Sequence, residues 1–572
     1  MKYRLLLLST LLFPFLSFAQ EQALAQEPGL DEKIDAAFKP VSDFFSDVIF
    51  FNVWHDPDIP FVLVLLVASA LFFTIYFGFP NIRFFGKAIN TVRGKYEDIE
   101  KHGAKELYGE DGIAQGQDLS NVDIEEHLAK VEGDLAVDGD IVDTIRDESS
   151  DGEVSHFQAL ATAVSGTVGN GNIAGVALAI ALGGPGATFW MIICGLLGMS
   201  TKFVECTLGV QYRDVGEDGT VYGGPMYYIS KGLKAKGFKN VGKVAAVIFA
   251  IFCIGGSFGG GNAAQSNQAT IVLKELFNWQ STAAGAIVGV VLAILVGVII
   301  IGGIKRIAQV TEKVVPFMAV MYVVACLYII FSNFSLIDDA VSLIVTEAFN
   351  PKAIGVGGFI GVLLVGFKRA AFSNEAGAGS ASIAHSAVRT KYSASEGLVA
   401  LLEPFIDTVL ICTMTALVIV IFNFGGFFEY GVDVSTDGSG AVMIGNEVVQ
   451  GAGITAKAFA EYIPFSNIFL TIAVVLFAVS TMISWSYYGL QSWKFLFGRG
   501  KAADLTYKLL FLIFVVIGAA ASMGSIWAFS DAMIFAMVFP NMIGLFFLYP
   551  VVKKQLNRYL DAIKLKADAI DD

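Results

Sequence analysis

The chain has 572 residues, of which 55% are hydrophobic and 16% charged, with a mean hydropathy of +0.64. About a quarter of the residues in a water-soluble protein are charged, so this composition excludes a soluble globular fold. From Glu97 to Glu153, nineteen acidic and four basic residues give a charge of −15, against −14 for the whole chain, so the remainder sums to +1. The acidity belongs to one segment and indicates no nucleic-acid partner.

The first residues have the pattern of a secretory signal. Lys2 and Arg4 precede the apolar run Leu5–Leu16, and Ser17-Phe18-Ala19 follows it. A basic start, a short apolar stretch and a small residue at the end predict a cleaved signal peptide over residues 1–19. An uncleaved anchor helix is the alternative interpretation of the same pattern.

Apolar blocks of roughly 20 residues, the length of a helix that crosses a bilayer, follow an extracytoplasmic N-terminal segment at 20–59. The first block is expected to form a transmembrane helix at 60–80. Ten more lie near 157–182, 187–211, 243–262, 282–303, 312–332, 354–383, 398–422, 465–488, 507–527 and 530–551. The sequence therefore predicts an all-α polytopic membrane protein with about 11 transmembrane helices.

Basic residues alternate from loop to loop between these blocks. Lys and Arg gather after the odd-numbered blocks, whereas the long segment Asn423–Pro464 contains Lys457 as its one basic residue. Because cytoplasmic loops collect basic residues, the pattern places the N-terminus outside and the C-terminus inside. We expect a multi-pass protein of a bacterial inner membrane, with a cytoplasmic tail at 556–572.

The acidic segment at 97–153 forms a predicted cytoplasmic insertion between the first and second spans. Scattered apolar residues such as Ile113, Val122 and Ile141 could support a small amphipathic unit. The high charge is equally typical of a partly disordered linker, and both interpretations stay open.

Two spans carry glycine and polar residues where a simple membrane anchor would carry leucine. The second span contains Ser165–Gly175, and the seventh contains Arg369–Ser380. Unpaired backbone groups cost several kcal/mol each in lipid, so these segments must line a protected polar cavity. Close helix packing around glycine is the alternative, and it explains one such span better than two at matched positions.

The two broken spans are five spans apart, so the second to sixth and the seventh to eleventh spans form two halves of five helices. An odd number of helices gives the halves opposite orientations, which is the inverted-repeat plan of secondary transporters. The predicted ten-helix core covers residues 154–555 and has one helix before it. In such breaks, freed amides can hold a carboxylate and unwound carbonyls can hold a small cation.

Patterns for other chemistries are lacking in the sequence. The GxG at 169–171 has no βαβ context, and the chain has neither a phosphate-binding loop nor a catalytic dyad or metal motif. The five cysteines lie in apolar stretches without a CxxC pair, so we expect them to act as packing residues. The sequence therefore does not indicate an enzyme.

Five motifs make a known family recognisable. They are Gly169–Gly175, Ile180–Gly186, Gly223–Ile229, Phe372–Gly377 and Ser480–Gly489. In this order, over about residues 60–555, they resemble the alanine/glycine:cation (sodium:alanine) symporter family of the amino acid–polyamine–organocation superfamily. Asn170 stands where that family usually has threonine.

The resemblance implies a LeuT-like fold and sodium-coupled import of alanine or glycine by alternating access. Its implied partners are a small neutral amino acid, a sodium ion as the coupling ion and the lipid bilayer, with no other cofactor. Family positions for the substrate map onto Asn170, Gly171, Gln265, Phe372, Thr481 and Trp485. Superfamily positions for sodium map onto Ser165, Val168, Ser480 and Thr481.

These residues suit the roles that the resemblance assigns. Asn170 and Gly171 offer backbone amides to a carboxylate, and Gln265 can hydrogen-bond the polar end of the substrate. Phe372 and Trp485 are bulky walls that leave room for a short side chain, although either aromatic residue alone could equally be a packing residue.

Ionisable residues inside spans usually pair with one another or serve function. Glu375 lies in the second break, and we expect either a gate ion pair with Arg369 or Lys368 or a contact with substrate. Lys202 and Glu205, three residues apart on the third span, are expected to pair with each other.

Three further ionisable residues are interpreted by their position. Glu403 and Asp407, one turn apart, are expected to mark the cytoplasmic entry of a helix. His385 is expected at the membrane interface rather than in a catalytic role.

A secondary active symporter is the leading hypothesis. One alternative is a transporter-derived amino-acid sensor, with the acidic insertion as its signalling part. The other is a cation channel, which would lack a closed pocket for an amino acid.

Overall fold

The computed structural model describes residues 29–55, 58–104, 144–145, 152–216, 219–279, 281–350, 358–435 and 438–571. The predicted signal peptide at 1–19 and most of the acidic insertion, including 105–143, lie outside the described residues.

The protein is mainly helical, and its longer helices coincide with the predicted apolar blocks. Those of the first half are α3 (Phe61–Tyr76), α9 (His156–Thr167), η2 (Gly171–Gly175), α10 (Val176–Gly183), α11 (Gly186–Gln211), α13 (Lys239–Phe258), η3 (Gly259–Ala263), α14 (Ala264–Leu276), α15 (Ala284–Ile300) and α16 (Gly303–Ser332). Those of the second half are α18 (Gly358–Asn374), α19 (Ala381–His385), α20 (Ser393–Ala400), α21 (Leu402–Pro404), η6 (Phe405–Cys412), α22 (Thr413–Asn423), α24 (Ser466–Phe497), α25 (Lys501–Ala520) and α26 (Met523–Asp571).

Within the described ranges, seven helices are long and apolar enough to cross a membrane, or eight if the bent pair α9–α10 is one span. The apolar helices α3 and α15 are shorter, with 16 and 17 residues. These helices confirm the prediction of an α-helical, multi-pass membrane protein. The number of eleven crossings and the inverted repeat stay predictions.

Both predicted breaks interrupt helices. The chain bends by 51° between α9 and α10, and the π-helical turn η2 lies at the bend. In the second break, α18 ends at Asn374 and Glu375 has a φ of 55°, which residues other than glycine rarely adopt. Gly377 and Gly379, with φ of 96° and 86°, continue the turn in conformations that glycine adopts without strain.

Shorter helices and small antiparallel sheets lie between the long helices. The helices are α2 (Leu30–Ile49), α4 (Pro80–Arg83), α5 (Phe85–Val92), α6 (Glu97–His102), α12 (Pro225–Ala235), η4 (Phe334–Leu336), α17 (Ile337–Phe349) and α23 (Ala452–Tyr462). The sheets are β1 (Asn52–His55) with β2 (Asp58–Pro60), then β3 (Thr144–Ile145), β4 (Asp214–Gly216) and β5 (Val221–Tyr222) in that order, and β6 (Val442–Ile444) with β7 (Glu447–Val449). Through β3, one end of the acidic insertion pairs with the segment that follows α11.

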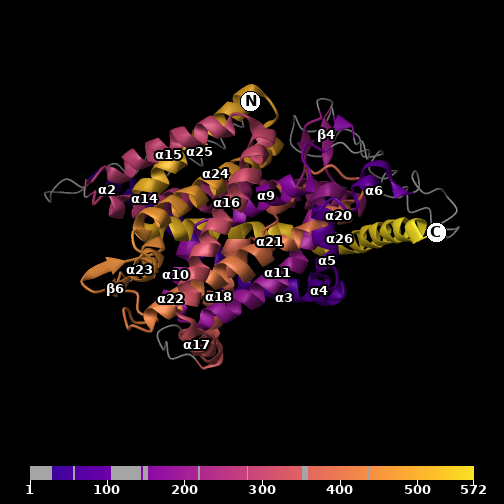
Figure 1. Cartoon of the computed structure of the whole chain (residues 1–572). Coiled ribbons are helices and arrows are strands. Elements are labelled where there is room, and N and C mark those ends of the chain that lie inside the picture. Colours follow the sequence, from indigo (N-terminus) through magenta and orange to yellow (C-terminus); the bar gives the residue numbers. More distant parts are fainter. Residues whose placement is uncertain are drawn as a thin grey trace.

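The N-terminal helix α2 packs across the ends of α15, α25 and α26 rather than standing free. The ring of Phe38 lies 5.1 Å from that of Phe529, and Oγ of Ser42 donates to the carbonyl of Ser525 at 2.7 Å. Asp31 accepts from the amide of Gly285 at 3.1 Å, at the start of α15. This end of the molecule lies opposite the C-terminus, which α26 reaches after crossing the whole bundle (Figure 1).

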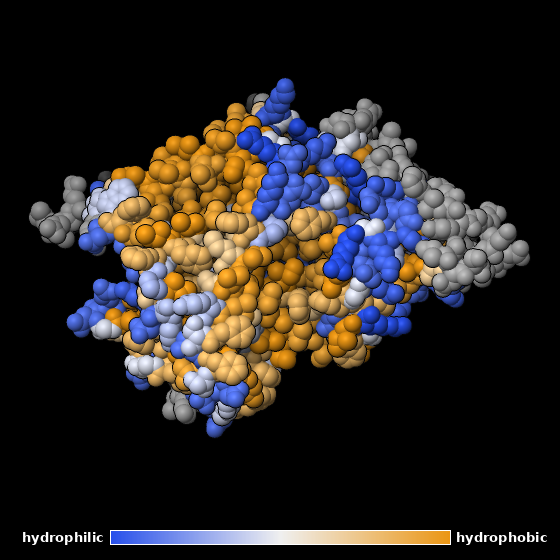
Figure 2. Space-filling view, viewed as in Figure 1, coloured by the Kyte–Doolittle hydropathy of each residue, from blue (hydrophilic) through white to orange (hydrophobic). Residues whose placement is uncertain are grey.

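The surface has the distribution expected of a membrane protein. Hydrophobic residues cover the flank of α15 and α25, and hydrophilic residues gather toward the ends that carry α6 and α20 on one side and β6 on the other (Figure 2). Exposed apolar side chains on α15 include Val291, Ile294 and Val298. A lipid environment accounts for their exposure, since a soluble protein rarely leaves so large an apolar surface uncovered.

The predicted orientation can be tested because all five native cysteines are buried. Asn446, between β6 and β7, and Lys236, at the end of α12, are both exposed. We expect Asn446→Cys to react with a membrane-impermeant maleimide on intact cells. We expect Lys236→Cys to react with it only after the cells have been permeabilised. The opposite pattern would contradict an outer Asn423–Pro464 segment and a cytoplasmic C-terminus.

Candidate functional site

The first break is held by side chains that accept its backbone amides. The amide of Gly169 donates to Oδ1 of Asn172, and the amide of Asn170 donates to Oε1 of Gln265, both at 2.9 Å. Nδ2 of Asn170 also donates to the carbonyl oxygen of Gln265 at 3.2 Å. The structure therefore brings the predicted residues Asn170 and Gln265 together, although 95 residues separate them.

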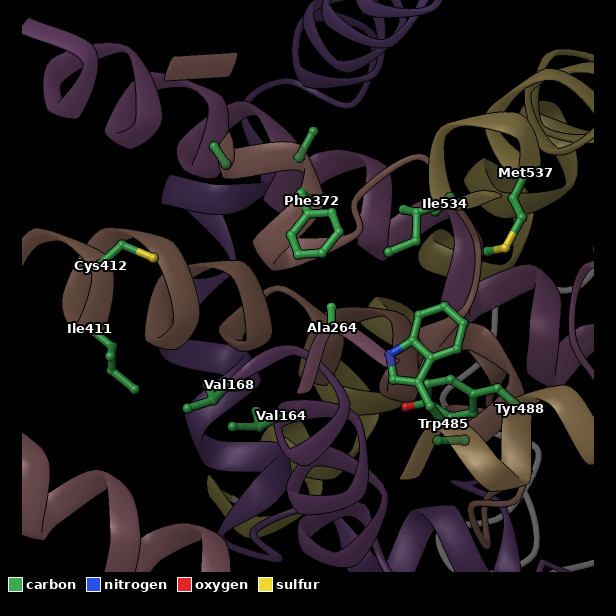
Figure 3. Close-up of a cluster of buried hydrophobic side chains, with 14 of the residues drawn as sticks. Val164, Val168, Ala264, Phe372, Ile411, Cys412, Trp485, Tyr488, Ile534 and Met537 are labelled. Atoms are coloured by element: carbon green, nitrogen blue, oxygen red, sulfur yellow. The ribbon is translucent and has the colours of Figure 1, made fainter. Parts of the chain in front are cut away.

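The end of α9 is bonded to the middle of α24 by a reciprocal pair of hydrogen bonds. Oγ of Ser165 donates to the carbonyl oxygen of Ser480 at 2.7 Å, and Oγ1 of Thr481 donates to the carbonyl oxygen of Ser165 at 3.0 Å. Val168 is buried at the end of α9, and its amide donates to the carbonyl of Val164 at 2.7 Å (Figure 3). Three of the four predicted sodium residues are thus in direct contact.

Two aromatic side chains lie against the glycines of η3, and Gly261 leaves the room that Trp485 occupies. A Cβ added to Gly261 would collide with the side chain of Trp485, and one added to Gly260 would lie 3.4 Å from Cε2 of Phe372. Both rings lie around Ala264 and Ile534 in Figure 3. The two predicted walls therefore face the same glycine-rich turn.

The first and second breaks also touch each other. A Cβ on Gly171 would lie 3.7 Å from Cδ1 of Phe372 and 3.5 Å from Cα of Ser373, so the two breaks are in van der Waals contact. Oδ1 of Asn170 is buried close by and has no hydrogen-bond partner among the described residues. The predicted substrate residues thus gather at one place, with a buried polar atom available to a ligand.

Of the two alternatives for Glu375, the gate ion pair with Arg369 or Lys368 is wrong, and the contact with substrate stays a prediction. Its carboxylate instead accepts from Nε1 of Trp485 at 2.9 Å and from the hydroxyl of Ser380. Arg369 and Lys368 both pair with Asp531 of α26, Lys368 at 3.0 Å. The reversal of the chain at Glu375 separates its side chain from the two basic residues that precede it in sequence.

The predicted pair of Lys202 and Glu205 is also wrong. Nζ of Lys202 donates to Oε1 of Glu403 at 3.0 Å, with both side chains fully buried. Glu205 accepts from Nδ2 of Asn541 at 2.7 Å. Sequence spacing indicates which residues share a helix face, but both partners here come from other helices.

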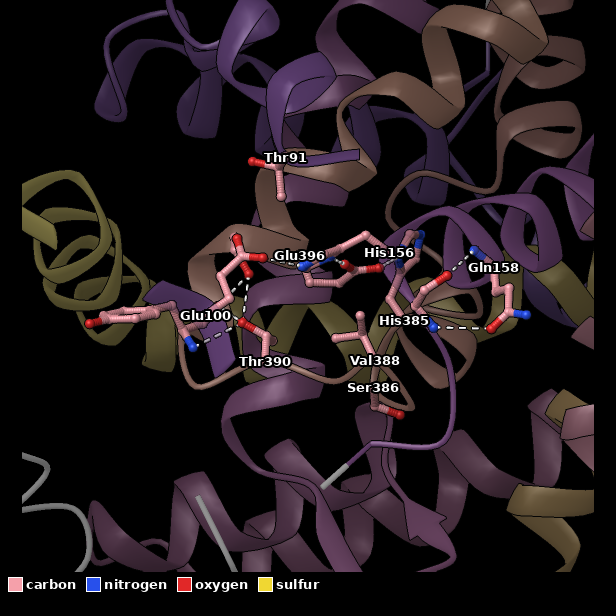
Figure 4. A network of polar contacts seen from close by, with 12 residues as sticks. Thr91, Glu100, His156, Gln158, His385, Ser386, Val388, Thr390 and Glu396 are labelled. Carbon is pink, nitrogen blue, oxygen red and sulfur yellow. Dashed lines mark hydrogen bonds and ion pairs between the residues drawn. The ribbon is translucent and has the colours of Figure 1, made fainter. Parts of the chain in front are cut away.

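His385 and Glu403 are buried in a polar network, and Glu403 lies inside the span Ser393–Asn423 rather than at a helix boundary. Nε2 of His385 lies 3.6 Å from Oε2 of Glu403, and its Nδ1 contacts Glu396. Glu396 also contacts His156, whose Nε2 lies 2.8 Å from Oε2 of Glu100 (Figure 4). This network joins α6, the first residue of α9, α19, α20 and α21 at the end of the molecule opposite α2.

The placement of Asp407 corrects a further prediction. The residue lies in η6, its side chain is fully buried, and it contacts both broken helices instead of marking a boundary. Asn172 and Ser373, the neighbours that contact it, were part of the recognised motifs but received no role from the sequence. A carboxylate inside an apolar block was the signal that could have identified it.

The buried pair of Lys202 and Glu403 leads to a stability prediction. Removing one partner of a buried ion pair costs about 3–5 kcal/mol, because the other charge is left uncompensated. We expect Lys202→Met to lower the thermal unfolding temperature of the purified protein, and Glu403→Gln in the same chain to restore part of the loss. Lys457→Met, at a partly exposed pair with Glu447, is the control and should cost less than about 1 kcal/mol. An equal loss in Lys202→Met and Lys457→Met would contradict this account.

The family model and the curated relatives identify one family. The model of the sodium:alanine symporter family matches residues 139–571. The sodium/alanine symporter AgcS of Methanococcus maripaludis is 40% identical over 74% of this chain and 88% of its own. The amino-acid carrier protein AlsT of Bacillus subtilis is 30% identical over 93% of this chain and 95% of its own.

Among solved structures, the chain is similar to a manganese transporter of Eremococcus coleocola, with 14% identity and a TM-score of 0.46 over 76% of this chain and 89% of that chain. The family match and the curated relatives both cover most of this chain, and they identify it as a multi-pass membrane transporter rather than an enzyme. The chain belongs to the sodium:alanine symporter family.

Proposed function

We propose that the protein is a sodium-coupled secondary active symporter that imports alanine or glycine by alternating access. One observation carries the proposal. The first break lies against Gln265 and α24, and Oδ1 of Asn170 is buried there without a hydrogen-bond partner among the described residues. Membership of the sodium:alanine symporter family supports amino-acid and cation symport in general.

The carboxylate of the substrate binds the amides of Asn170 and Gly171. In the structure the Asn170 amide donates to Oε1 of Gln265, so a carboxylate takes over this donor and releases the Gln265 oxygen. Oε1 of Gln265 and Oδ1 of Asn170 can then accept hydrogen bonds from the ammonium group. One small cluster therefore recognises both charged ends of a zwitterion.

The sodium ion binds where Ser165, Ser480 and Thr481 contact one another, with Val168 supplying a carbonyl. Sodium is a hard cation that prefers oxygen ligands, and hydroxyls and unwound carbonyls are what this position offers. The ion would replace the two hydrogen bonds between α9 and α24. Since Thr481 also faces Gly169, ion binding affects the segment that holds the substrate.

The proposed topology follows the sequence pattern. The spans from α9 to α16 and from α18 to α26 form two inverted halves, each opening with a broken helix. The N-terminus lies outside and the C-terminus in the cytoplasm of a bacterial inner membrane. With this orientation, the network around His156 and His385 lies at the cytoplasmic side.

The first functional prediction concerns coupling. Because a zwitterion enters together with a cation, alanine uptake into proteoliposomes should require an inward sodium gradient and carry positive charge inward. Uptake of labelled alanine at fixed membrane potential, with sodium replaced by choline, measures this dependence.

Two outcomes would contradict the coupling mechanism. Uptake that ignores sodium and follows a proton gradient would remove sodium as the coupling ion. Sodium flux without counterflow of labelled alanine would indicate a channel instead of a symporter.

The second functional prediction concerns substrate size. Exclusion of an added methylene by a packed wall is worth about 1–3 kcal/mol, or about 10–200-fold. Trp485→Ala should therefore admit larger neutral amino acids such as valine and weaken the binding of alanine, whose methyl group loses a contact. Competition by unlabelled amino acids against labelled alanine measures the change.

Trp493→Ala is the matched control for this experiment. Trp493 lies two turns further along α24, where its ring centroid is 4.2 Å from that of Phe497, away from the break. The control should keep the competition profile of the native protein. An unchanged profile in a transporting Trp485→Ala variant would remove Trp485 from the pocket.

A further inference from the structure

The indole of Trp485 is held by a single polar contact. Trp485 is buried on α24, and its Nε1, the one polar atom of the side chain, donates to Oε1 of Glu375 at 2.9 Å. The rest of the ring lies against Gly256, Gly261 and Tyr488, whose ring centroid is 5.3 Å away. Apolar contacts have no preferred direction, whereas a hydrogen bond is directional. The bond to Glu375 therefore sets the angle at which the indole lies.

Glu375 has a backbone conformation that is unusual for a buried residue. Its φ of 55° belongs to the left-handed region, which residues other than glycine rarely adopt. In the described residues three other non-glycine residues have a positive φ, and all three are exposed: Phe79, Asn278 and Phe465. Strain at a buried residue persists where the surrounding contacts demand it, and it is typical of functional sites. At the second break, this turn directs the side chain of Glu375 to α24.

Neighbours within the second break hold the carboxylate of Glu375 in place. Oδ1 of Asn374 accepts from the amide of Ala376 at 3.0 Å, which closes the turn around Glu375. The hydroxyl of Ser380 donates to Oε2 of Glu375, so each carboxylate oxygen already accepts a hydrogen bond. Because both oxygens have donors, the carboxylate acts on its protein neighbours in this conformation. Of these neighbours, Trp485 is the one that belongs to the candidate pocket.

Trp485 connects this carboxylate to the rest of the candidate site. It lies four residues after Thr481, so the two side chains share one face of α24. The rings of Trp485 and Phe372 lie around Ala264 and Ile534 (Figure 3). A rotation of the indole would change the room between these two walls. The hydrogen bond to Glu375 therefore controls the width of a pocket that α24 lines.

We propose that Glu375 determines the size of the amino acid that the pocket admits, by holding the indole of Trp485 in the pocket wall. This proposal rests on the proposed function and adds a specificity-determining residue to it. Glu375 is a positioning residue, since it acts through Trp485 and does not touch the substrate. The native protein then favours neutral amino acids with a side chain about the size of a methyl group, because the fixed indole occupies the space of a longer one.

Two substitutions of Glu375 separate the hydrogen bond from the charge. Glu375→Gln keeps an oxygen that can accept from the indole, and the hydroxyl of Ser380 can accept from the new amide group. Glu375→Leu removes the acceptor at a similar volume. Unlabelled valine and alanine compete against labelled alanine in proteoliposomes with an inward sodium gradient. We expect Glu375→Leu to shift the competition toward valine about 10-fold, at the lower end of what one packed wall contributes, and Glu375→Gln to keep the native profile.

A double-mutant cycle tests whether Glu375 acts through Trp485. Trp485→Phe keeps an aromatic ring and removes the hydrogen-bond donor. Once the donor is gone, loss of the acceptor should matter little, so adding Glu375→Leu to the Trp485→Phe chain should shift the competition by less than about 2-fold. A residue that merely supports the fold would shift the profile equally in both chains. Equal shifts would therefore overturn the proposal.

Ser380→Ala covers the case in which Glu375→Leu does not fold. It keeps the carboxylate and removes the hydroxyl that holds Oε2, so it should shift the competition toward valine by about 2–5-fold, the scale of one modest hydrogen bond. Ser382→Ala is the matched control, because Ser382 is equally buried and its hydroxyl donates to the carbonyl oxygen of Gly379 at 2.7 Å. The control should keep the native profile. No shift in Ser380→Ala, or the same shift in both serine variants, would contradict the positioning role.

The outcomes separate this proposal from the proposed function. A native chain that takes up no alanine would overturn the proposed function and this proposal with it. Alanine uptake by the native chain, with an unchanged competition profile in Glu375→Leu, would overturn this proposal alone. Equal weakening of alanine and valine in Glu375→Gln would indicate a direct contact with the ammonium group of the substrate, which also overturns the positioning role.

Discussion

A helix that is broken inside a membrane must satisfy its freed backbone groups without water, and the rest of this structure depends on that constraint. At the first break the amides of Gly169 and Asn170 are accepted by the side chains of Asn172 and Gln265. At the second, Oδ1 of Asn374 accepts the amide of Ala376 at 3.0 Å. Gln265 also donates to the carbonyl of Gly260, and so satisfies a backbone group of the turn η3 that directly precedes α14.

The same rule applies to charge. Several charged side chains in the bundle interior form ion pairs whose members come from different helices, as for Lys202 with Glu403 and Arg369 with Asp531. Each pair removes a charge from contact with lipid and joins two helices that lack a hydrophobic reason to associate within the membrane. The polar contacts therefore specify which helices lie together, while the apolar surface specifies that the bundle lies in lipid.

The sequence predicted the helical blocks, both breaks and the set of residues that gather around them. Those features depend on local composition, on glycine, or on motifs that a family resemblance identifies. It did not predict the partners of Lys202, Glu375 or His385, because a spacing of three or four residues describes one helix and says nothing about its neighbours. The packing of α2 on α26 and the bridging position of Asp407 were missed for the same reason, since both are set by tertiary contacts between residues far apart in the chain.

The bonds that satisfy the first break also determine how a ligand can be recognised there. A carboxylate that takes the Asn170 amide must displace Oε1 of Gln265, which already accepts it at 2.9 Å. A neutral hydrogen bond contributes about 0.5–1.5 kcal/mol net and one to a charged group about 1.5–3 kcal/mol, so the exchange gains roughly 1 kcal/mol per amide. Any α-amino acid obtains this gain, because every one carries the same carboxylate. In the proposed function, discrimination between side chains is therefore assigned to Phe372 and Trp485, and the indole of Trp485 donates a hydrogen bond to Glu375 of the second break. On this proposal, the first break recognises the carboxylate that all amino acids share, and the residues held by the second break determine which side chains fit.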